Sequence, residues 1–107
     1  MITIEAQVTG ESITLITTPT LATNTVETAQ VVFSFDSEWD GYAKTAMFWG
    51  VDDEEHPSEV VDNAAIIPKE AMTDAGKMKL GVYGINGGKR LVSAKVSYKI
   101  AEGAYTA

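Results

Sequence analysis

Residues 33–48 read FSFDSEWDGYAKTAMF. Phe33 and Phe35 lie on one face of the run before the turn, and after Lys44 the residues Thr45, Met47 and Trp49 are opposed to Ala46 and Phe48. An acidic, aromatic turn lies between the two runs. Alternation with a period of two is typical of β-strands. The segment therefore predicts two strands joined by a turn. Trp39 should be buried in that turn, because its acidic neighbours supply the side that faces solvent.

The same alternation recurs along the rest of the chain. It predicts strands at residues 2–7, 13–18, 26–35, 44–49, 59–61, 64–67, 78–82 and 92–100. An acidic loop is expected at residues 50–58. The one helix-like patch begins at Pro68, a residue that suits the first helical position, and Gly76 suits its far end. About seven or eight short strands with one short connecting helix predict an all-β fold, a β-sandwich.

The last hairpin can be predicted more closely. Val82 lies on the apolar face of the incoming strand, and Val92 lies on the apolar face of the outgoing strand. Side chains on one face pair with each other across a β-ladder. Placing Val82 opposite Val92 requires an odd number of loop residues. We therefore expect a three-residue loop, Asn86-Gly87-Gly88, with a glycine in the left-handed region.

The chain has 107 residues, which predicts a single domain spanning residues 1–107, with residues 101–107 as a tail that we expect to fray. There is no cysteine, so disulfides and thiolate metal sites are excluded. No signal-peptide pattern and no apolar run long enough to span a membrane are present, so we expect no membrane partner.

The net charge of −7 is unevenly distributed. Residues 1–62 carry twelve acidic residues and one basic residue, Lys44, a net charge of −11. Residues 63–107 carry three acidic and seven basic residues, a net charge of +4. An acidic first half argues against nucleic-acid binding. The asymmetry fits either attraction within the chain, together with solubility, or complementarity between subunits of an assembly.

Two acidic segments are candidates for metal or catalytic sites. Residues 36–41 have the acidic spacing and the glycine of half a calcium loop, but the twelfth position, which should be glutamate, is Met47. Residues 52–56 are acidic and contain the only histidine, His56, without the further histidine or cysteine ligands of a metal site. A lone histidine also removes the usual nucleophile–base triad. A carboxylate pair would need a deep cleft, which a sandwich of this size seldom has room for.

We therefore predict no catalytic, cofactor-binding or metal-binding residues, and no cofactor. The glycine-rich segment 81–88 precedes no helix, which excludes nucleotide loops, and its glycines are expected to allow close packing or a turn. Five aromatic residues either form a surface for stacking sugars or pack in the core and the turns: Trp39, Tyr42, Phe48, Trp49 and Tyr83.

Three segments together resemble a known family. They are residues 35–48, residues 66–71 (IIPKEA), and residues 80–84 (LGVYG) followed by 89–91 (KRL). In this order and spacing the chain is similar to a module of tail, baseplate and other virion proteins of Firmicutes phages and prophages. The resemblance implies an immunoglobulin-like β-sandwich with a structural, non-enzymatic role. It covers packing and turn residues, among which we single out Trp39, Asp40, Gly41, Pro68, Asn86, Gly87 and Gly88.

The resemblance implies that the protein acts by attachment in a virion assembled in the bacterial cytoplasm. Its expected partners are other virion proteins of the capsid or tail. The resemblance is also compatible with a homo-oligomer. Because the chain ends at Ala107, where many tail proteins continue, we expect either a small stand-alone virion component, such as a capsid-decoration or head-fibre-like protein, or a truncated domain, in preference to a baseplate arm. The alternative is a carbohydrate-binding module for host surface glycans.

Overall fold

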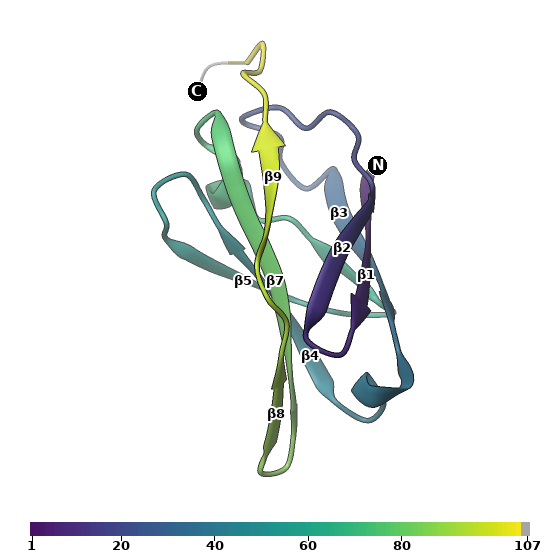
Figure 1. Ribbon diagram of the computed structural model, residues 1–107. Coiled ribbons are helices and arrows are strands. Elements are labelled where there is room, and N and C mark those ends of the chain that lie inside the picture. The colour runs from purple at the N-terminus through teal and green to yellow at the C-terminus, as the bar shows by residue number, and fades with distance from the viewer. Residues whose placement is uncertain (106–107) are drawn as a thin grey trace.

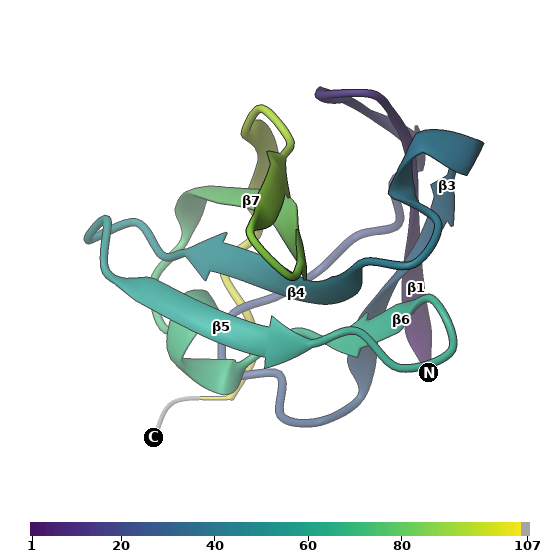
Figure 2. The same ribbon diagram turned by 90° about the horizontal axis from the view of Figure 1, so that it is seen from below.

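The computed structural model describes residues 1–105 and is built almost entirely of strands and loops. Two sheets pack together, so the predicted all-β sandwich is confirmed at that level. The first sheet has the order β2 (Ser12–Thr17), β1 (Ile2–Thr9), β3 (Ala29–Phe35) and β6 (Ala64–Ile66). The second sheet has the order β5 (Glu55–Glu59), β4 (Ala43–Trp49), β7 (Gly76–Asn86) and β8 (Lys89–Val92), and β9 (Val96–Ile100) also pairs with β7. Figures 1 and 2 show the two layers from the side and from below.

Side chains from both sheets and from the connecting segments fill the interior. The fully buried residues of the first sheet include Ile4, Val8 and Val31, and those of the second include Phe48, Met78 and Leu80. Connecting segments add Leu21, Trp39, Ile67 and Met72. The alternation seen in the sequence therefore places the apolar positions of each strand against the opposing sheet.

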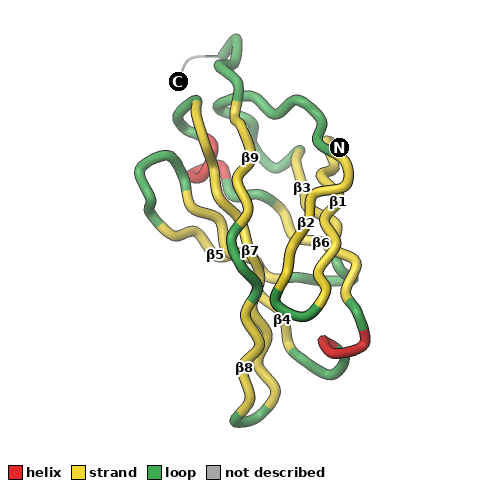
Figure 3. Tube along the Cα trace, in the orientation of Figure 1, coloured by secondary structure: helices red, strands yellow, loops and turns green. Residues whose placement is uncertain are grey.

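The first sheet contains a parallel pair, because β1 and β3 run in the same direction. A parallel pair needs a crossover, and residues 18–28 provide it (Figure 3). This connector is bound to the chain that follows β9: the Ala101 N–H donates to the Leu21 carbonyl at 2.8 Å, and the Thr23 N–H donates to the Ala101 carbonyl at 2.9 Å. Farther along, the Gly103 N–H donates to Thr23 Oγ1 at 2.8 Å. Residues 101–105, where fraying was expected, are thus held by hydrogen bonds, and the rest of that tail lies outside the described residues.

The second sheet corrects the predicted hairpin. Asn86 pairs with Lys89, so the loop has two residues, Gly87 and Gly88, and not three. Gly87 has φ +59°, which suits the first position of a two-residue hairpin turn. Val92 lies opposite Tyr83, not opposite Val82. The prediction was wrong because it treated residues 92–100 as one continuous strand.

The outgoing strand is interrupted between β8 and β9. Ser93 occupies the interruption, where its N–H donates to the Val82 carbonyl at 2.8 Å and its Oγ accepts from the Val82 N–H at 2.9 Å. The next N–H, that of Ala94, donates to the Glu11 carbonyl of the β1–β2 turn at 2.7 Å. The pairing then resumes with Val96 opposite Leu80, shifted by one residue. This shift turns Val92 to the side of the sheet opposite that of Val96.

Two further predictions are corrected. Residues 55–59 form the edge strand β5 and not part of a loop, and Pro57 is tolerated there because the outer side of an edge strand has no partner strand that needs an N–H. The predicted short helix after Pro68 is a single 3-10 turn, η2 (Lys69–Met72). A second such turn, η1 (Ser37–Trp39), lies in the acidic segment and was not predicted. Within residues 1–105, no helix is long and apolar enough to cross a membrane.

A buried tyrosine predicts how stability responds to alkaline pH. The Tyr98 hydroxyl donates a hydrogen bond to the Pro19 carbonyl, and burial raises the pKa of Tyr98 above its ordinary value of 10.0. Above pH 10.0 the unfolded chain loses this proton before the folded chain does, so the contribution of Tyr98 to the free energy of unfolding falls as pH rises. At neutral pH the free energy of unfolding of the wild type should exceed that of the Tyr98→Phe variant by about 1 kcal/mol. Urea unfolding of both proteins should show this difference shrinking above pH 10.0; a constant difference would contradict the assignment.

Candidate functional site

One surface of interest is the face of the second sheet that points away from the first sheet, which we call the outer face. Strand register determines its composition. Met47 lies between Pro57 on β5 and Gly81 on β7. The next residue of β4 on the same face is Thr45, which lies beside Tyr83 of β7. On the opposite side of the same strands, Ala46 and Phe48 are buried in the core with their β7 partners. β4 is therefore apolar on both faces.

The outer face is hollowed at its centre. An open groove of about 510 Å³ is lined by Met47, Trp49, Glu55, Gly81, Val82, Tyr83, Ile85, Arg90, Val92, Ser93 and Lys95. Gly81 is buried and lets the segment after β8 approach β7 closely, because a Cβ at this position would lie 3.2 Å from both the Ala94 carbonyl oxygen and Ser93 Oγ. Ile85 and Val92 stand at the edge of the groove with exposed fractions of 48% and 45%. An exposed apolar group of this kind, bordered by charges, is typical of a binding surface.

Charged side chains border the groove on both sides. Glu55 and Glu59 lie on β5 at one margin, and Arg90 on β8 lies at the other. Lys95 reaches across the face, with Nζ 4.0 Å from the centroid of the Trp49 ring, a cation–π contact. The stem of Lys95 and the ring of Trp49 therefore form one amphipathic wall.

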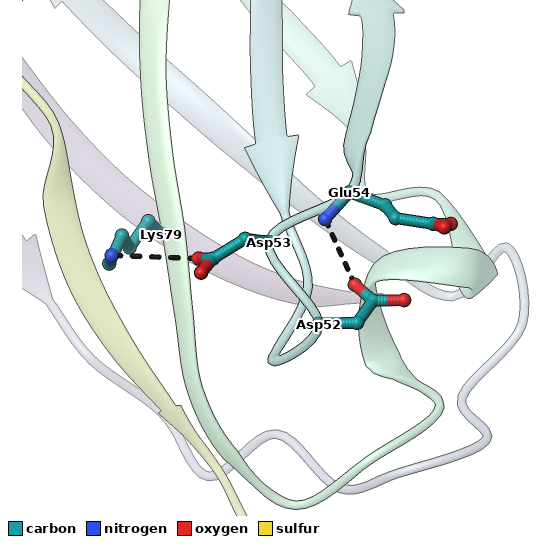
Figure 4. A network of polar contacts seen from close by, with 4 residues as sticks. All are labelled: Asp52, Asp53, Glu54 and Lys79. Carbon is teal, nitrogen blue, oxygen red and sulfur yellow. Dashed lines mark hydrogen bonds and ion pairs between the residues drawn. The ribbon is translucent and has the colours of Figure 1, made fainter.

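The acidic loop between β4 and β5 makes contacts within itself and one ion pair to Lys79 of β7 (Figure 4). Lys79 Nζ lies 3.7 Å from Asp53 Oδ1, and both side chains are substantially exposed, so this ion pair adds little stability. The Glu54 N–H donates to Asp52 Oδ1 at 3.1 Å. This bond closes a tight turn in which Asp53 adopts φ +63°.

The structure brings three candidate metal ligands together in this loop. One ligand atom each from Asp52, Glu54 and His56 lie within 4.8 Å of one another. His56 Nε2 is buried and has no hydrogen-bond partner among the described residues. Both carboxylates are exposed, however, and the turn just described already accounts for their proximity. Such groups are common in acidic loops without a metal.

The calcium-like segment is a structural turn. Asp36 Oδ2 accepts from the Gly10 N–H at 2.8 Å, and Asp36 Oδ1 accepts from the Glu38 N–H at 3.2 Å, so both carboxylate oxygens are engaged by the backbone. The second bond caps η1. Met47, where a calcium loop would carry glutamate, lies inside β4 and lines the groove.

Trp39 is fully buried, as predicted. Its Nε1–H donates to the Gly10 carbonyl at 2.8 Å, which joins the acidic turn to the β1–β2 turn. Asp40 follows as the C-terminal cap of η1, and Gly41 adopts φ +81°, a conformation that favours glycine.

The other residues singled out from the sequence are scattered over the fold. Pro68 precedes η2, whereas Asn86, Gly87 and Gly88 lie at the tip of the β7–β8 hairpin, which projects at the bottom of Figure 1. Neither group lines the groove of the outer face. These positions shape turns and do not form a common site.

The five aromatic residues do not gather on one surface. Trp39 and Phe48 are buried, and Tyr42 packs beside Trp39 with ring centroids 6.4 Å apart. Of the five, only Trp49 and Tyr83 line the groove. Sequence reasoning missed Met47, Ile85, Arg90, Val92 and Lys95 as members of this surface. The signal was the unbroken apolar run of residues 46–49, since a strand with one solvated face normally alternates with polar residues.

Comparison of the chain with protein-family models and with curated proteins gave no match.

Proposed function

We propose that this protein is a non-enzymatic structural component of a phage or prophage particle and works by protein–protein attachment through the outer face. Its partners are other virion proteins, of the capsid or the tail, or further copies of itself. It is assembled in the bacterial cytoplasm and carried in the virion. Neither a nucleic acid nor a membrane is part of the proposal.

One observation carries the proposal: the outer face combines an apolar, hollowed centre with charged margins. Specific protein–protein interfaces have this anatomy, with aromatic residues and methionine at the centre and polar residues at the rim. Met47, Trp49 and Tyr83 supply the centre, and Glu55 and Arg90 supply opposite margins. In a domain that already has a complete core between its two sheets, a second apolar surface is best explained by a partner that covers it.

The fold and the sequence resemblance support the same proposal. Two mainly antiparallel sheets packed together are compatible with an immunoglobulin-like sandwich, and we propose that finer class for this chain. The resemblance of residues 35–48, 66–71 and 80–84 with 89–91 to virion modules of Firmicutes phages and prophages is the reason for proposing a phage particle. Charge at the margins would steer docking, and this long-range contribution should weaken with salt.

Purified particles of the phage, or of the induced prophage, that encodes the chain provide the test. Mass spectrometry should find the protein in density-purified particles in a constant ratio to the major capsid protein. A high ratio indicates head decoration, and a low ratio close to that of baseplate proteins indicates a tail position. A replication protein of the same phage serves as the control and should be depleted on purification. Absence of the chain from particles, while it is abundant in the lysate, would contradict the proposed function.

A carbohydrate-binding module for host surface glycans is the second candidate. The observation in its favour is that Trp49 and Tyr83 line one open groove together with charged side chains. Against it, Lys95 Nζ lies over the Trp49 ring, where a sugar would have to stack. Calorimetric titration with host cell-wall polysaccharide separates the two candidates. Saturable binding that is lost in Trp49→Ala, but kept in Tyr42→Ala, would favour the glycan module.

A further inference from the structure

We infer that the outer face is self-complementary and that two copies of the chain pack through it, face to face, as a closed two-fold dimer. The inference rests on the proposed function, because it names the partner of the face to which that function is assigned. The occupant is a second copy of this chain, and the dimer would be the unit that is placed on the particle.

The centre of the outer face supplies the apolar contact. Met47, Trp49 and Tyr83 are half-buried in the isolated chain, and Ile85 and Val92 are exposed. In a two-fold interface the same patch contacts itself, so an apolar centre on one copy always meets an apolar centre on the other. The open groove between these side chains, about 510 Å³ in volume, leaves room for a projecting side chain of the second copy.

The margins carry opposite charges in a matching order. Glu55 is paired with Trp49 and Glu59 with Thr45 along the β5 margin. On the opposite margin, Arg90 is paired with Ile85, which itself pairs with Ala43. Lys95 also starts from that margin, in the segment between β8 and β9, and extends its Nζ across the face to the Trp49 ring. Along the strand direction the order is therefore Glu55 then Glu59 on one margin, and Lys95 then Arg90 on the other.

A two-fold axis parallel to the strands, lying in the plane of contact, exchanges the two margins and keeps the order along the strands. It brings Glu55 of one copy toward the margin from which Lys95 of the second copy extends, and Glu59 toward Arg90. Each such contact occurs twice. The interface is therefore closed, and complementary charge fixes the orientation of the two copies.

The competing arrangement, edge-to-edge extension of the second sheet, is disfavoured by Pro57. This residue is in the middle of the edge strand β5 and has no N–H to donate to an added strand. Face-to-face contact needs no backbone groups, so Pro57 does not oppose it.

The size of the face predicts a weak dimer. Four strands about 4.8 Å apart and on average about seven residues long give a face of roughly 19 by 24 Å. Two such faces would bury about 900 Å² in total, at the low end of specific interfaces. We therefore expect dissociation in the micromolar range.

Analytical ultracentrifugation of the purified chain from roughly 5 to 500 µM tests the inference. A reversible monomer–dimer equilibrium that stops at the dimer is expected, weakened several-fold at roughly 0.5 M salt because the margins are screened. A chain that remains monomeric, or that forms species larger than a dimer, would overturn the inference.

Charge reversal tests the orientation. Glu55→Lys with Glu59→Lys makes both margins positive, and Arg90→Glu with Lys95→Glu makes both negative, so each double variant alone should lose at least tenfold in dimer affinity. Mixed in equal amounts, the two variants should form a heterodimer, since each positive margin then meets a negative one. Glu27→Lys with Glu70→Lys reverses two exposed charges off the outer face and should dimerise as the wild type does. Failure of the mixture to restore dimers would overturn the proposed orientation.

The two proposals fail separately. A monomeric chain that is present in purified particles leaves the structural function standing and removes the dimer. A dimeric chain that is absent from particles keeps the dimer and removes the virion function.

Discussion

The Trp39→Ala variant is expected to lose about 3–5 kcal/mol of unfolding free energy, the cost of removing a large buried aromatic side chain. Trp39 is fully buried, and its ring packs against Phe35 with centroids 5.3 Å apart. The substitution also leaves the Gly10 carbonyl without the indole N–H that now donates to it. Since η1 and the β1–β2 turn both depend on this side chain, one end of the sandwich would open.

Thermal and urea unfolding measure the loss. For a domain of this size, the melting temperature should fall by roughly 15–25 °C. Trp39→Phe, which keeps a ring in the cavity, should be clearly less destabilised. It replaces the alanine variant in the measurement if that variant does not fold. Trp49→Ala is the matched control: the same atoms are removed from a half-buried position on the outer face, so in dilute protein the loss should be much smaller. A loss below about 1 kcal/mol for Trp39→Ala would show that this ring does not seal the sandwich.

The Gly84→Ala variant should show the second largest effect. A Cβ at Gly84 would lie 2.8 Å from Tyr42 Cβ and 3.3 Å from Trp39 Cζ3. Tyr42 Cβ is attached directly to the backbone, so the clash cannot be relieved by rotating a flexible side chain. We expect a loss of about 1–3 kcal/mol, as for other overpacked core positions.

Gly88→Ala is the control for this substitution. Gly88 is in the hairpin loop and does not have a positive φ, and a Cβ added to it would meet no other group within 4 Å. Alanine there should be neutral or slightly stabilising, because it lowers the entropy of the unfolded chain. Equal unfolding midpoints for the Gly84 and Gly88 variants would contradict the packing of Trp39 and Tyr42 against β7.

Local patterns were sufficient for several features. Alternation at residues 2–7 and the two opposed faces of residues 44–49 correctly predicted strands, since the period of side chains along a strand is a local property. Burial of Trp39 followed from its acidic neighbours, which occupy the solvent side of the turn. The turn after Pro68 was located correctly, because a fixed φ suits the start of a helical turn.

The hairpin loop could not be predicted by the same reasoning. Its length depended on whether residues 92–100 form one strand, and the interruption at Ser93 is created by hydrogen bonds to Val82 on β7 and from Ala94 to Glu11 of the other sheet. β5 was missed because Pro57 and a run of acidic residues disfavour a strand locally, whereas pairing with β4 stabilises it.

The sequence by itself determined the all-β class, most strand positions and the buried tryptophan, because each depends on neighbours a few residues away along the chain. The tertiary structure decided the parallel pairing of β1 with β3, the shift of register between β8 and β9, and the outer face. That face joins β4, β5, β7 and β8, and its side chains come from residues 45–95. Which faces of these strands meet solvent depends on where the first sheet packs, and packing between distant segments is a property of the whole fold.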